Sequence, residues 1–510
     1  MEKSRKKKSL VNILVAFVSN ILIYVLSLFT SKVIKENLGL QVLGLNGVLS
    51  NVISILGLSE MGIGAAITFA LYKPLAEDNH DLIKSIMNFY KKAYRIVALI
   101  VLVIGLLIFP LVPSFIKHSD FSKPYIYLVY SLFLVNSVIS YLLVYKRTLI
   151  IADQKNYVIT IAALVYTYAL KISQLAVVYF TSNYILFLIV QIVCTFVYNF
   201  VVSLICDKIY PYLKEKSEPL PEELKSTFFT KIRAIFWHSL GGVVVFGTDN
   251  LLVSWFCGVE EAGRYTSYVS VIAMITNMIS LVFNNMQDSI GNFLVTETKE
   301  KQKDLFDKLF YLNQSLASVC SVCLALLLTP FIRVWLGSDT VLSNAIIIAL
   351  VVSFYFSRNR SVILAVKNTA GLFEDDKFAP IIESVINLIS SIILAKFFGL
   401  IGVVLGTILS TLLVPFWVQP VIVYKKVFNK NVMTYFSQYF MYMLKMCLIY
   451  AIVYFLMEKI IKFTPQNFWV FLLEAAVVFV AVCLMWILLT FWKKEFKYYV
   501  ALVVNKIKRR

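Results

Sequence analysis

Four basic residues fall inside or at the edge of long apolar stretches, where a charge is costly. They are Lys171, Arg333, Arg358 and Arg360. A charged side chain in membrane hydrocarbon costs about 2.5 to 3.5 kcal/mol on insertion, so it usually faces a cavity or a partner. Arginine presents a planar fork of donors that fits phosphate oxygens. These residues are therefore candidates for binding the phosphate groups of an anionic cargo. The alternative for Arg358 and Arg360, at the predicted inner end of their span, is that they anchor the helix at the membrane surface.

A second group of residues in such stretches carries carboxylates or amides. It comprises Glu60, Asp249, Asp288, Asn277 and Asn284. At 100° per residue, Asn277, Asn284 and Asp288 share one face of a helix, and Glu60 lies on a stripe of small and polar residues. Such groups could contact sugar hydroxyls or carry a coupling proton (H+) or sodium ion (Na+). The alternative is that they join neighbouring helices by hydrogen bonds, as polar residues in membranes commonly do.

No motif for catalysis accompanies these residues. The sequence lacks the Gly-x4-Gly-Lys-Ser/Thr loop that holds ATP phosphates, and its three histidines, His80, His118 and His238, are far apart. The lysines are spread over many loops without an aromatic-interleaved patch, which argues against nucleic-acid binding. We therefore expect no catalytic residue, no metal site, no bound cofactor and no enzyme activity.

The elements that position these residues are predicted to be membrane-spanning helices. Of the 510 residues, 60% are hydrophobic and only 15% are charged, whereas a soluble chain carries about 25% charged residues. About fourteen apolar runs are long enough to cross a bilayer. Their approximate ranges are 10–31, 43–71, 96–116, 125–145, 157–180, 184–206, 234–256, 265–294, 309–332, 341–357, 378–396, 402–424, 436–456 and 467–491. The predicted fold class is an all-α polytopic membrane protein.

The net charge of +19 reports the orientation of these helices. If the amino terminus is cytoplasmic, 37 of the 48 Lys and Arg residues lie in inner loops and tails and only 9 in outer loops. Basic residues accumulate on the cytoplasmic side of membrane proteins. Both termini are therefore predicted to be cytoplasmic, in a plasma membrane.

The longest break between spans divides the chain into two predicted lobes. We expect an N-lobe over 1–206, a cytoplasmic linker over 207–233, a C-lobe over 234–430, and spans thirteen and fourteen with a basic tail over 431–510. A weak internal repeat supports the division, because Gly39 to Gly44 and Gly258 to Gly263 are both Gly-x4-Gly turns at matching places of each lobe. Doubled topology of this kind is how many transporters are built.

Several stretches, in this order, resemble bacterial polysaccharide biosynthesis proteins of the oligosaccharide flippase family, within the multidrug/oligosaccharidyl-lipid/polysaccharide exporter superfamily. The resemblance spans nearly the whole chain. The stretches that carry it are Leu58–Ala66, Leu71–Glu77, Tyr145–Leu149, Ala152–Lys155, Gly258–Tyr268, and the run from Arg358 through Gly371–Phe373, Pro380–Glu383 and Gly399–Gly406.

This resemblance implies two pseudo-symmetric six-helix lobes around a central cavity, with two further C-terminal helices. It implies that the cargo is an undecaprenyl-diphosphate-linked oligosaccharide, moved by alternating access for capsule, O-antigen, teichoic-acid-like or other surface polysaccharide. The expected partners are this lipid-linked oligosaccharide, membrane lipids, and the polysaccharide polymerase and glycosyltransferases of the pathway.

Two other functions remain open at this point. A multidrug cation antiporter of the same superfamily would use the carboxylates to bind cationic drugs. A membrane glycosyltransferase or polysaccharide polymerase would need a large outer loop for its chemistry, and every predicted outer loop is about ten residues or shorter.

Overall fold

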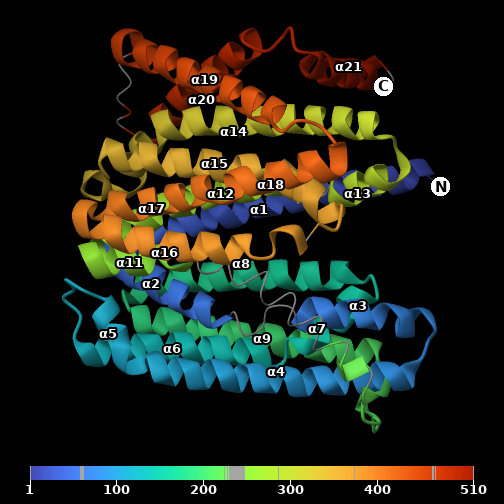
Figure 1. The fold of residues 1–510 in the computed structure, drawn as a ribbon. Helices are drawn as coiled ribbons and strands as arrows, with labels where there is room; N and C mark the ends of the chain where they lie inside the picture. The colour runs from blue at the N-terminus through green and yellow to red at the C-terminus, as the bar shows by residue number, and fades with distance from the viewer. Residues whose placement is uncertain are drawn as a thin grey trace. The chain divides into compact units, whose positions relative to one another are not determined.

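The computed structural model describes residues 2–57, 63–222, 224–226, 228, 247–284, 286–372, 374–461, 465 and 467–508. Within these ranges the chain is helical and contains no strand (Figure 1). It divides into two compact units, Met1–Gly263 and Arg264–Arg510. The boundary between the two units lies within a helix and does not coincide with the predicted lobe boundaries. The lobe boundaries concern membrane topology, and they stay a prediction.

The first unit begins with a long helix and ends with a short one. Its elements are α1 (Glu2–Leu38), α2 (Leu40–Leu56), α3 (Ile63–Ala76), α4 (His80–Ile108), η2 (Phe109–Leu111), α5 (Val112–Phe115), α6 (Lys123–Leu142), α7 (Tyr145–Ala152), α8 (Asn156–Thr181), α9 (Tyr184–Ile209), η3 (Pro211–Lys214) and α11 (Asp249–Cys257).

The second unit continues from α12, whose first turn still belongs to the first unit. Its elements are α12 (Val259–Asn284), α13 (Gln287–Thr296), α14 (Lys299–Leu336), η4 (Ser338–Thr340), α15 (Asn344–Thr369), η5 (Glu374–Asp376), α16 (Ala379–Phe398), α17 (Leu400–Leu413), α18 (Pro415–Val423), η6 (Tyr424–Phe428), α19 (Met433–Leu456), η7 (Met457–Ile461), α20 (Phe468–Leu488) and α21 (Lys494–Lys508).

Eleven helices of the described residues are long and apolar enough to cross a membrane, and they match eleven of the predicted spans one by one. Of the other three, 10–31 lies within α1, 43–71 corresponds to α2 and α3, and 234–256 is described only from residue 247. Large apolar side chains such as Phe180 and Leu473 stay 80% and 72% exposed. Water disfavours so much exposed apolar surface, whereas hydrocarbon accepts it. The chain is a multi-pass integral membrane protein.

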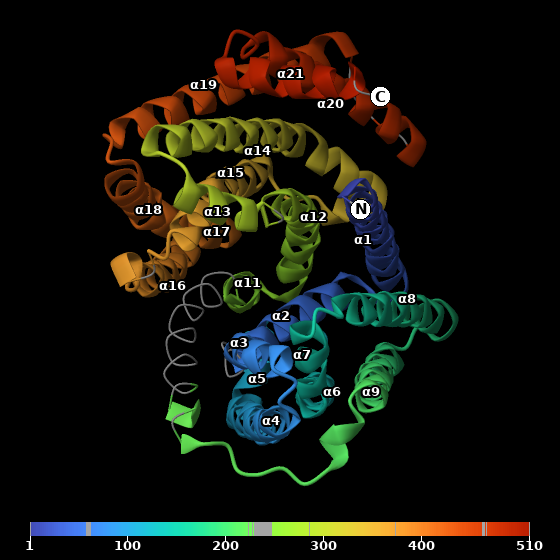
Figure 2. The same ribbon diagram turned by 90° about the vertical axis from the view of Figure 1, so that its right-hand side faces the viewer.

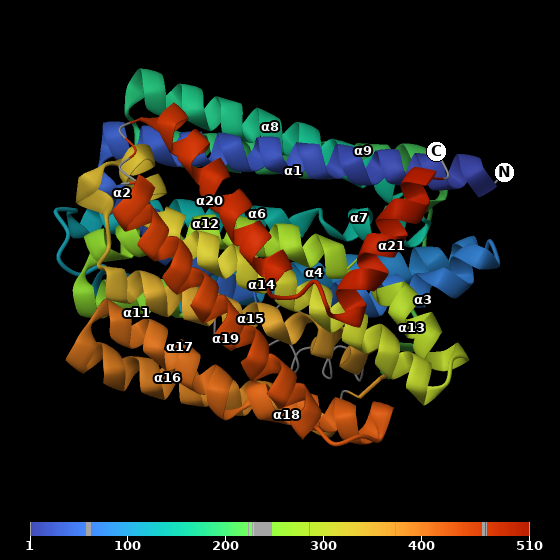
Figure 3. The same ribbon diagram turned by 90° about the horizontal axis from the view of Figure 1, so that it is seen from above.

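Helices α1, α8 and α9 of the first unit lie side by side, and α4, α6 and α9 form a second packed group (Figure 3). The polar stripe predicted on 43–71 faces tyrosines of these neighbours. The hydroxyl of Tyr184 donates to the Asn46 amide oxygen at 3.0 Å, and a methyl group on Gly64 would lie 3.5 Å from the hydroxyl of Tyr90. At these positions the stripe joins helices. Glu60 lies outside the described residues.

Helices α2 and α12 begin with the same turn. Gly39 precedes α2 with φ 88° and ψ 167°, and Gly258 precedes α12 with φ 100° and ψ 162°. A positive φ of this kind favours glycine, because a side chain there would clash with the backbone. The two Gly-x4-Gly segments found in the sequence therefore have nearly the same conformation.

The second glycine of each segment packs against the other segment. A methyl group on Gly44 would lie 1.9 Å from the carbonyl oxygen of Val259, and one on Gly263 would lie 2.5 Å from the carbonyl oxygen of Leu40. Leu40 and Val259 hold the same place, directly after the positive-φ glycine. The contact is therefore close to two-fold symmetric, and the absence of side chains allows the backbones to approach.

The segment that follows α9 is fixed to the ends of α4 and α7. The ammonium of Lys146 lies 2.6 Å from a carboxylate oxygen of Asp207, and the hydroxyl of Tyr210 donates to Asp153 at 2.6 Å. Burial raises the pKa of Asp153, but hydrogen bonds from Lys155 and Tyr210 outweigh it, so the pKa lies below its ordinary value. The motif from Tyr145 to Lys155 therefore anchors the start of the predicted linker.

The second unit is built on α14, with α15 packed against one side of this helix and α19 and α20 against another (Figure 2). Helices α16 and α17 form a close hairpin. Methyl groups on Gly402 and Gly406 would lie 2.2 Å from the Leu394 carbonyl oxygen and 2.2 Å from the Ser391 hydroxyl. The Gly399–Gly406 stretch that contributed to the resemblance thus serves helix packing.

We predict that Gly44→Val destabilises the protein, because the new side chain would overlap the Val259 carbonyl. Overpacking of this kind costs about 1 to 3 kcal/mol, and we expect a lower melting temperature for the detergent-solubilised protein, measured by intrinsic fluorescence. Gly291→Ala is the matched control, since a methyl there meets its nearest neighbour in Thr369 at 3.6 Å. A Gly44→Val protein as stable as the wild type would contradict the close contact.

Candidate functional site

Arg358 and Arg360 lie near the middle of α15 and not at its inner end as predicted. Arg358 is the fifteenth of the 26 residues of α15. At 1.5 Å per residue it lies about 21 Å from one end of the helix and about 16 Å from the other. The predicted span 341–357 ended too early because the apolar run stops at these charges, although the helix continues to Thr369. The arginines are thus too deep to be simple surface anchors.

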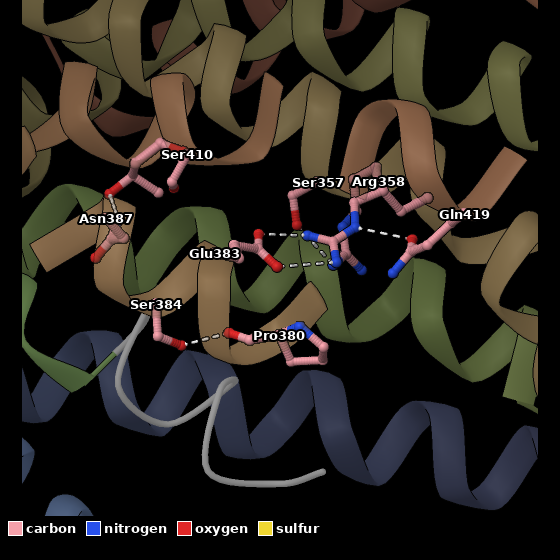
Figure 4. A network of polar contacts seen from close by, with 10 residues as sticks. Ser357, Arg358, Pro380, Glu383, Ser384, Asn387, Ser410 and Gln419 are labelled. Atoms are coloured by element: carbon pink, nitrogen blue, oxygen red, sulfur yellow. Dashed lines mark hydrogen bonds and ion pairs between the residues drawn. The ribbon is translucent and has the colours of Figure 1, made fainter. Parts of the chain in front are cut away.

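Arg360 forms a two-pronged ion pair with Glu383 of α16. Its two terminal nitrogens donate to the two carboxylate oxygens at 2.9 and 3.4 Å, and its Nε donates to the amide oxygen of Gln419 in α18 at 3.4 Å. Figure 4 shows Glu383 and Gln419 on the two sides of this network. The side chains are 19% and 8% exposed for Arg360 and Glu383. Burial makes this pairing obligatory, because either charge alone would be poorly solvated.

Arg358 has hydroxyl partners and, within the described part of the chain, no carboxylate partner. Its Nη1 donates to Ser280 of α12 at 2.9 Å and its Nη2 to Ser357 at 3.2 Å. Its buried Nε donates to no group among the described residues. The side chain is half-buried. Among the described residues, two neutral hydroxyls leave the positive charge of Arg358 without a compensating carboxylate.

A buried polar network holds the backbone of α15 in place around these arginines. The Asn313 amide of α14 donates to the carbonyl oxygen of Arg358 at 3.1 Å, and Tyr355 donates to Gln314 at 3.0 Å. Asn359 donates to the hydroxyl of Tyr439 in α19 at 3.5 Å. Sequence reasoning missed these residues, although adjacent Asn313 and Gln314 inside an apolar span were a usable signal.

The other basic candidates lie elsewhere. Arg333 is exposed in the last turn of α14, where a cation complements the helix dipole. Arg358, by contrast, lies in the middle of α15. Lys171 belongs to the first unit, is half-buried in α8, and has no carboxylate within ion-pair distance among the described residues. Within the second unit, Arg358 and Arg360 share the middle of α15, whereas Arg333 lies at the end of α14.

The acidic and amide candidates also lie on different helices. Asp249 is buried in the first turn of α11, a position favoured for a carboxylate by the helix dipole. Asn277 is exposed on α12, one turn before Ser280, so the face of α12 that carries it is the one near Arg358. The side chains of Asn284 and Asp288 lie outside the described ones. Helix α12 ends at Asn284 and α13 begins at Gln287, so Asn277 and Asp288 belong to different helices, and their shared face stays a prediction.

No family model matches the chain, and no curated protein matches it by sequence. Solved structures do. The inward closed form of the lipid II flippase MurJ is 17% identical and has a TM-score of 0.63, covering 92% of this chain and 97% of MurJ. An inward-facing MATE-family multidrug resistance transporter of the MOP superfamily is 12% identical and has a TM-score of 0.59. The match covers 77% of this chain and 91% of the transporter chain.

A further MATE multidrug transporter, DinF-BH, is 14% identical and has a TM-score of 0.56. The match covers 81% of this chain and 95% of the DinF-BH chain. The chain has the fold of the MOP-superfamily transporters. The resemblance to this superfamily predicted from the sequence is therefore confirmed at the level of the fold. By their descriptions these structures are a lipid II flippase and two multidrug transporters.

Within this MOP-type fold, we predict that Glu383→Ala is strongly destabilising. The substitution leaves the Arg360 guanidinium buried without its carboxylate, and such a loss costs roughly 3 kcal/mol or more. The melting temperature of the purified protein should fall by several degrees.

The matched control is the double variant Arg360→Met with Glu383→Leu. It removes both charges and keeps apolar volume, so it should recover most of the lost stability. If the single variant melts at the wild-type temperature, the ion pair does not stabilise the contact between α15 and α16.

Proposed function

We propose that this protein is a flippase that moves an undecaprenyl-diphosphate-linked oligosaccharide across the plasma membrane for capsule or other surface polysaccharide. The observation that carries the proposal is Arg358, a guanidinium at membrane depth held only by hydroxyls within the described residues. A diphosphate crossing hydrocarbon unaided meets a large desolvation barrier. A cation at that depth lowers this barrier for an anion and raises it for a cation.

The charge balance around α15 favours an anionic cargo over a cationic drug. Among the described residues, Arg358 and Arg360 face one carboxylate, Glu383, and that carboxylate is already paired with Arg360. One positive charge of this described network is therefore left. A cation antiporter would need a carboxylate that can exchange a drug for an ion, and Glu383 could serve only by giving up a buried ion pair.

The cargo path in this proposal is a hydrated route that accepts the diphosphate and sugars while the prenyl tail remains in lipid. Alternating access would open and close the contact between α2 and the start of α12, where the glycine backbones meet at the predicted outer surface. A contact made by backbone without interlocking side chains can separate without unpacking a core. Asp249 remains the described candidate for a coupling proton or sodium ion.

We predict that Arg358→Ala reduces transport at least tenfold. Purified protein in liposomes would be supplied with a fluorescent undecaprenyl-diphosphate-linked sugar, and the fraction reaching the opposite leaflet would be followed by a membrane-impermeant quencher. Arg358→Lys keeps the charge but loses the planar fork, so it should retain an intermediate rate.

Lys396→Ala is the charge-matched control, because Lys396 is exposed in the last turn of α16. It should flip lipid at the wild-type rate. If wild-type liposomes leave the lipid-linked sugar on its original leaflet but export a fluorescent cationic drug, the antiporter function is correct. If Arg358→Ala flips the lipid normally, Arg358 is not part of the diphosphate site.

A further inference from the structure

A basic pocket lies in the first unit, at the end predicted to face the cytoplasm. It is formed by the beginning of α4, the beginning of α7, the end of α9 and residues 213–217, and its volume is about 630 Å³. Five lysines and two carboxylates line it. The pocket belongs to neither the arginine network of α15 nor the transport path proposed above.

Two of the lysines are neutralised and fix the walls. Lys84 is only 9% exposed and lies 2.9 Å from Glu215 and 2.8 Å from Asp81. Lys146 lies 2.6 Å from Asp207. These pairs use both carboxylates of the lining. Their role is to hold α4, α7, α9 and the linker segment together.

The other three lysines have no such partner. No carboxylate of the described ranges lies within ion-pair distance of Lys91, Lys214 or Lys216, and all three line the same pocket. Lys214 and Lys216 are exposed, and Lys91 is half-buried. Three ammonium groups that share one cavity repel each other unless an anion lies between them. Ammonium groups bind phosphate oxygens as point charges.

The pocket is held in shape without a ligand. The Asn88 amide donates to the Ser217 hydroxyl at 2.9 Å, and the rings of His80 and Tyr212 stack with centroids 4.1 Å apart. The linker segment is therefore already attached to α4 on both sides of the cavity. Binding a ligand would therefore not include the free-energy cost of ordering this wall.

The same helix that supplies Lys91 continues into apolar surface. Ile96 and Leu99 of α4 are each 58% exposed, and Leu99 lies about 12 Å along the helix from Lys91. A charged group at the lysines would thus have apolar surface beside it at the depth of acyl chains. Basic pockets of this kind on the cytoplasmic side of membrane proteins suit anionic lipid headgroups.

We propose that this pocket binds the phosphate headgroup of an anionic phospholipid of the inner leaflet. The bound phosphate lies between Lys91, Lys214 and Lys216, and the acyl chains follow α4. By bridging α4 and residues 214–216, the lipid fastens the start of the linker to the first unit. The proposal does not depend on the identity of the transported cargo.

The test is the melting temperature of the full-length protein in detergent, titrated separately with phosphatidylglycerol, phosphatidylcholine and inorganic phosphate. A ligand that binds only the folded state raises the melting temperature with concentration. We expect phosphatidylglycerol to do so, and phosphatidylcholine and inorganic phosphate to have little effect at equal concentration. The triple variant Lys91→Gln, Lys214→Gln, Lys216→Gln should need at least tenfold more phosphatidylglycerol for the same shift.

A triple variant of exposed lysines in the second unit, Lys425→Gln, Lys430→Gln and Lys497→Gln, changes the net charge equally and should respond as the wild type does. If both triple variants lose the response equally, the effect is one of overall charge and the site is wrong. If inorganic phosphate alone gives the full shift, the pocket binds a soluble phosphate compound and the lipid assignment is wrong.

Discussion

A guanidinium in the middle of a membrane cannot lack compensating groups, and this requirement organises the second unit. Arg360 obtains its carboxylate from α16 and an amide oxygen from α18, while Arg358 obtains hydroxyls from α12 and from its own helix. Two neighbouring side chains thereby connect α15 to three other helices. The two arginines differ in their partners, because Arg360 is paired with a carboxylate, whereas Arg358 is held by hydroxyls among the described residues.

Charged groups of the first unit also need partners at its predicted inner end, where water is close and a charge costs less free energy than in hydrocarbon. Here the ion pair of Lys84 with Glu215 holds the segment after α9 against the beginning of α4. Deep in the hydrocarbon, polar contacts hold helices together, whereas near the surface they hold a connecting segment on helices. The stretches that carried the family resemblance belong to both settings, which explains why they look so different from one another.

Much of the helical layout followed from the sequence, because apolar runs of membrane length have few alternatives. The end of the predicted span 341–357 was wrong. The apolar run stops at Arg358, whereas tertiary contacts stabilise the helix beyond this residue. Periodicity assumes an unbroken helix, whereas Asn277 and Asp288 belong to two helices, α12 and α13. The partners of Arg360 lie 23 and 59 residues away along the chain, and helical periodicity shows which residues share a face but never which faces meet.

The glycine contact between α2 and α12 has the form of an isologous interface. In a two-fold dimer, residue i of one subunit touches residue j of the other, and j touches i in return. Gly44 against Val259 and Gly263 against Leu40 reproduce that reciprocity within a single polypeptide. Such geometry is expected when a gene encoding a self-associating half-protein is duplicated and fused. After fusion each half can diverge alone, so one half can acquire an arginine such as Arg358 without placing a second in its counterpart.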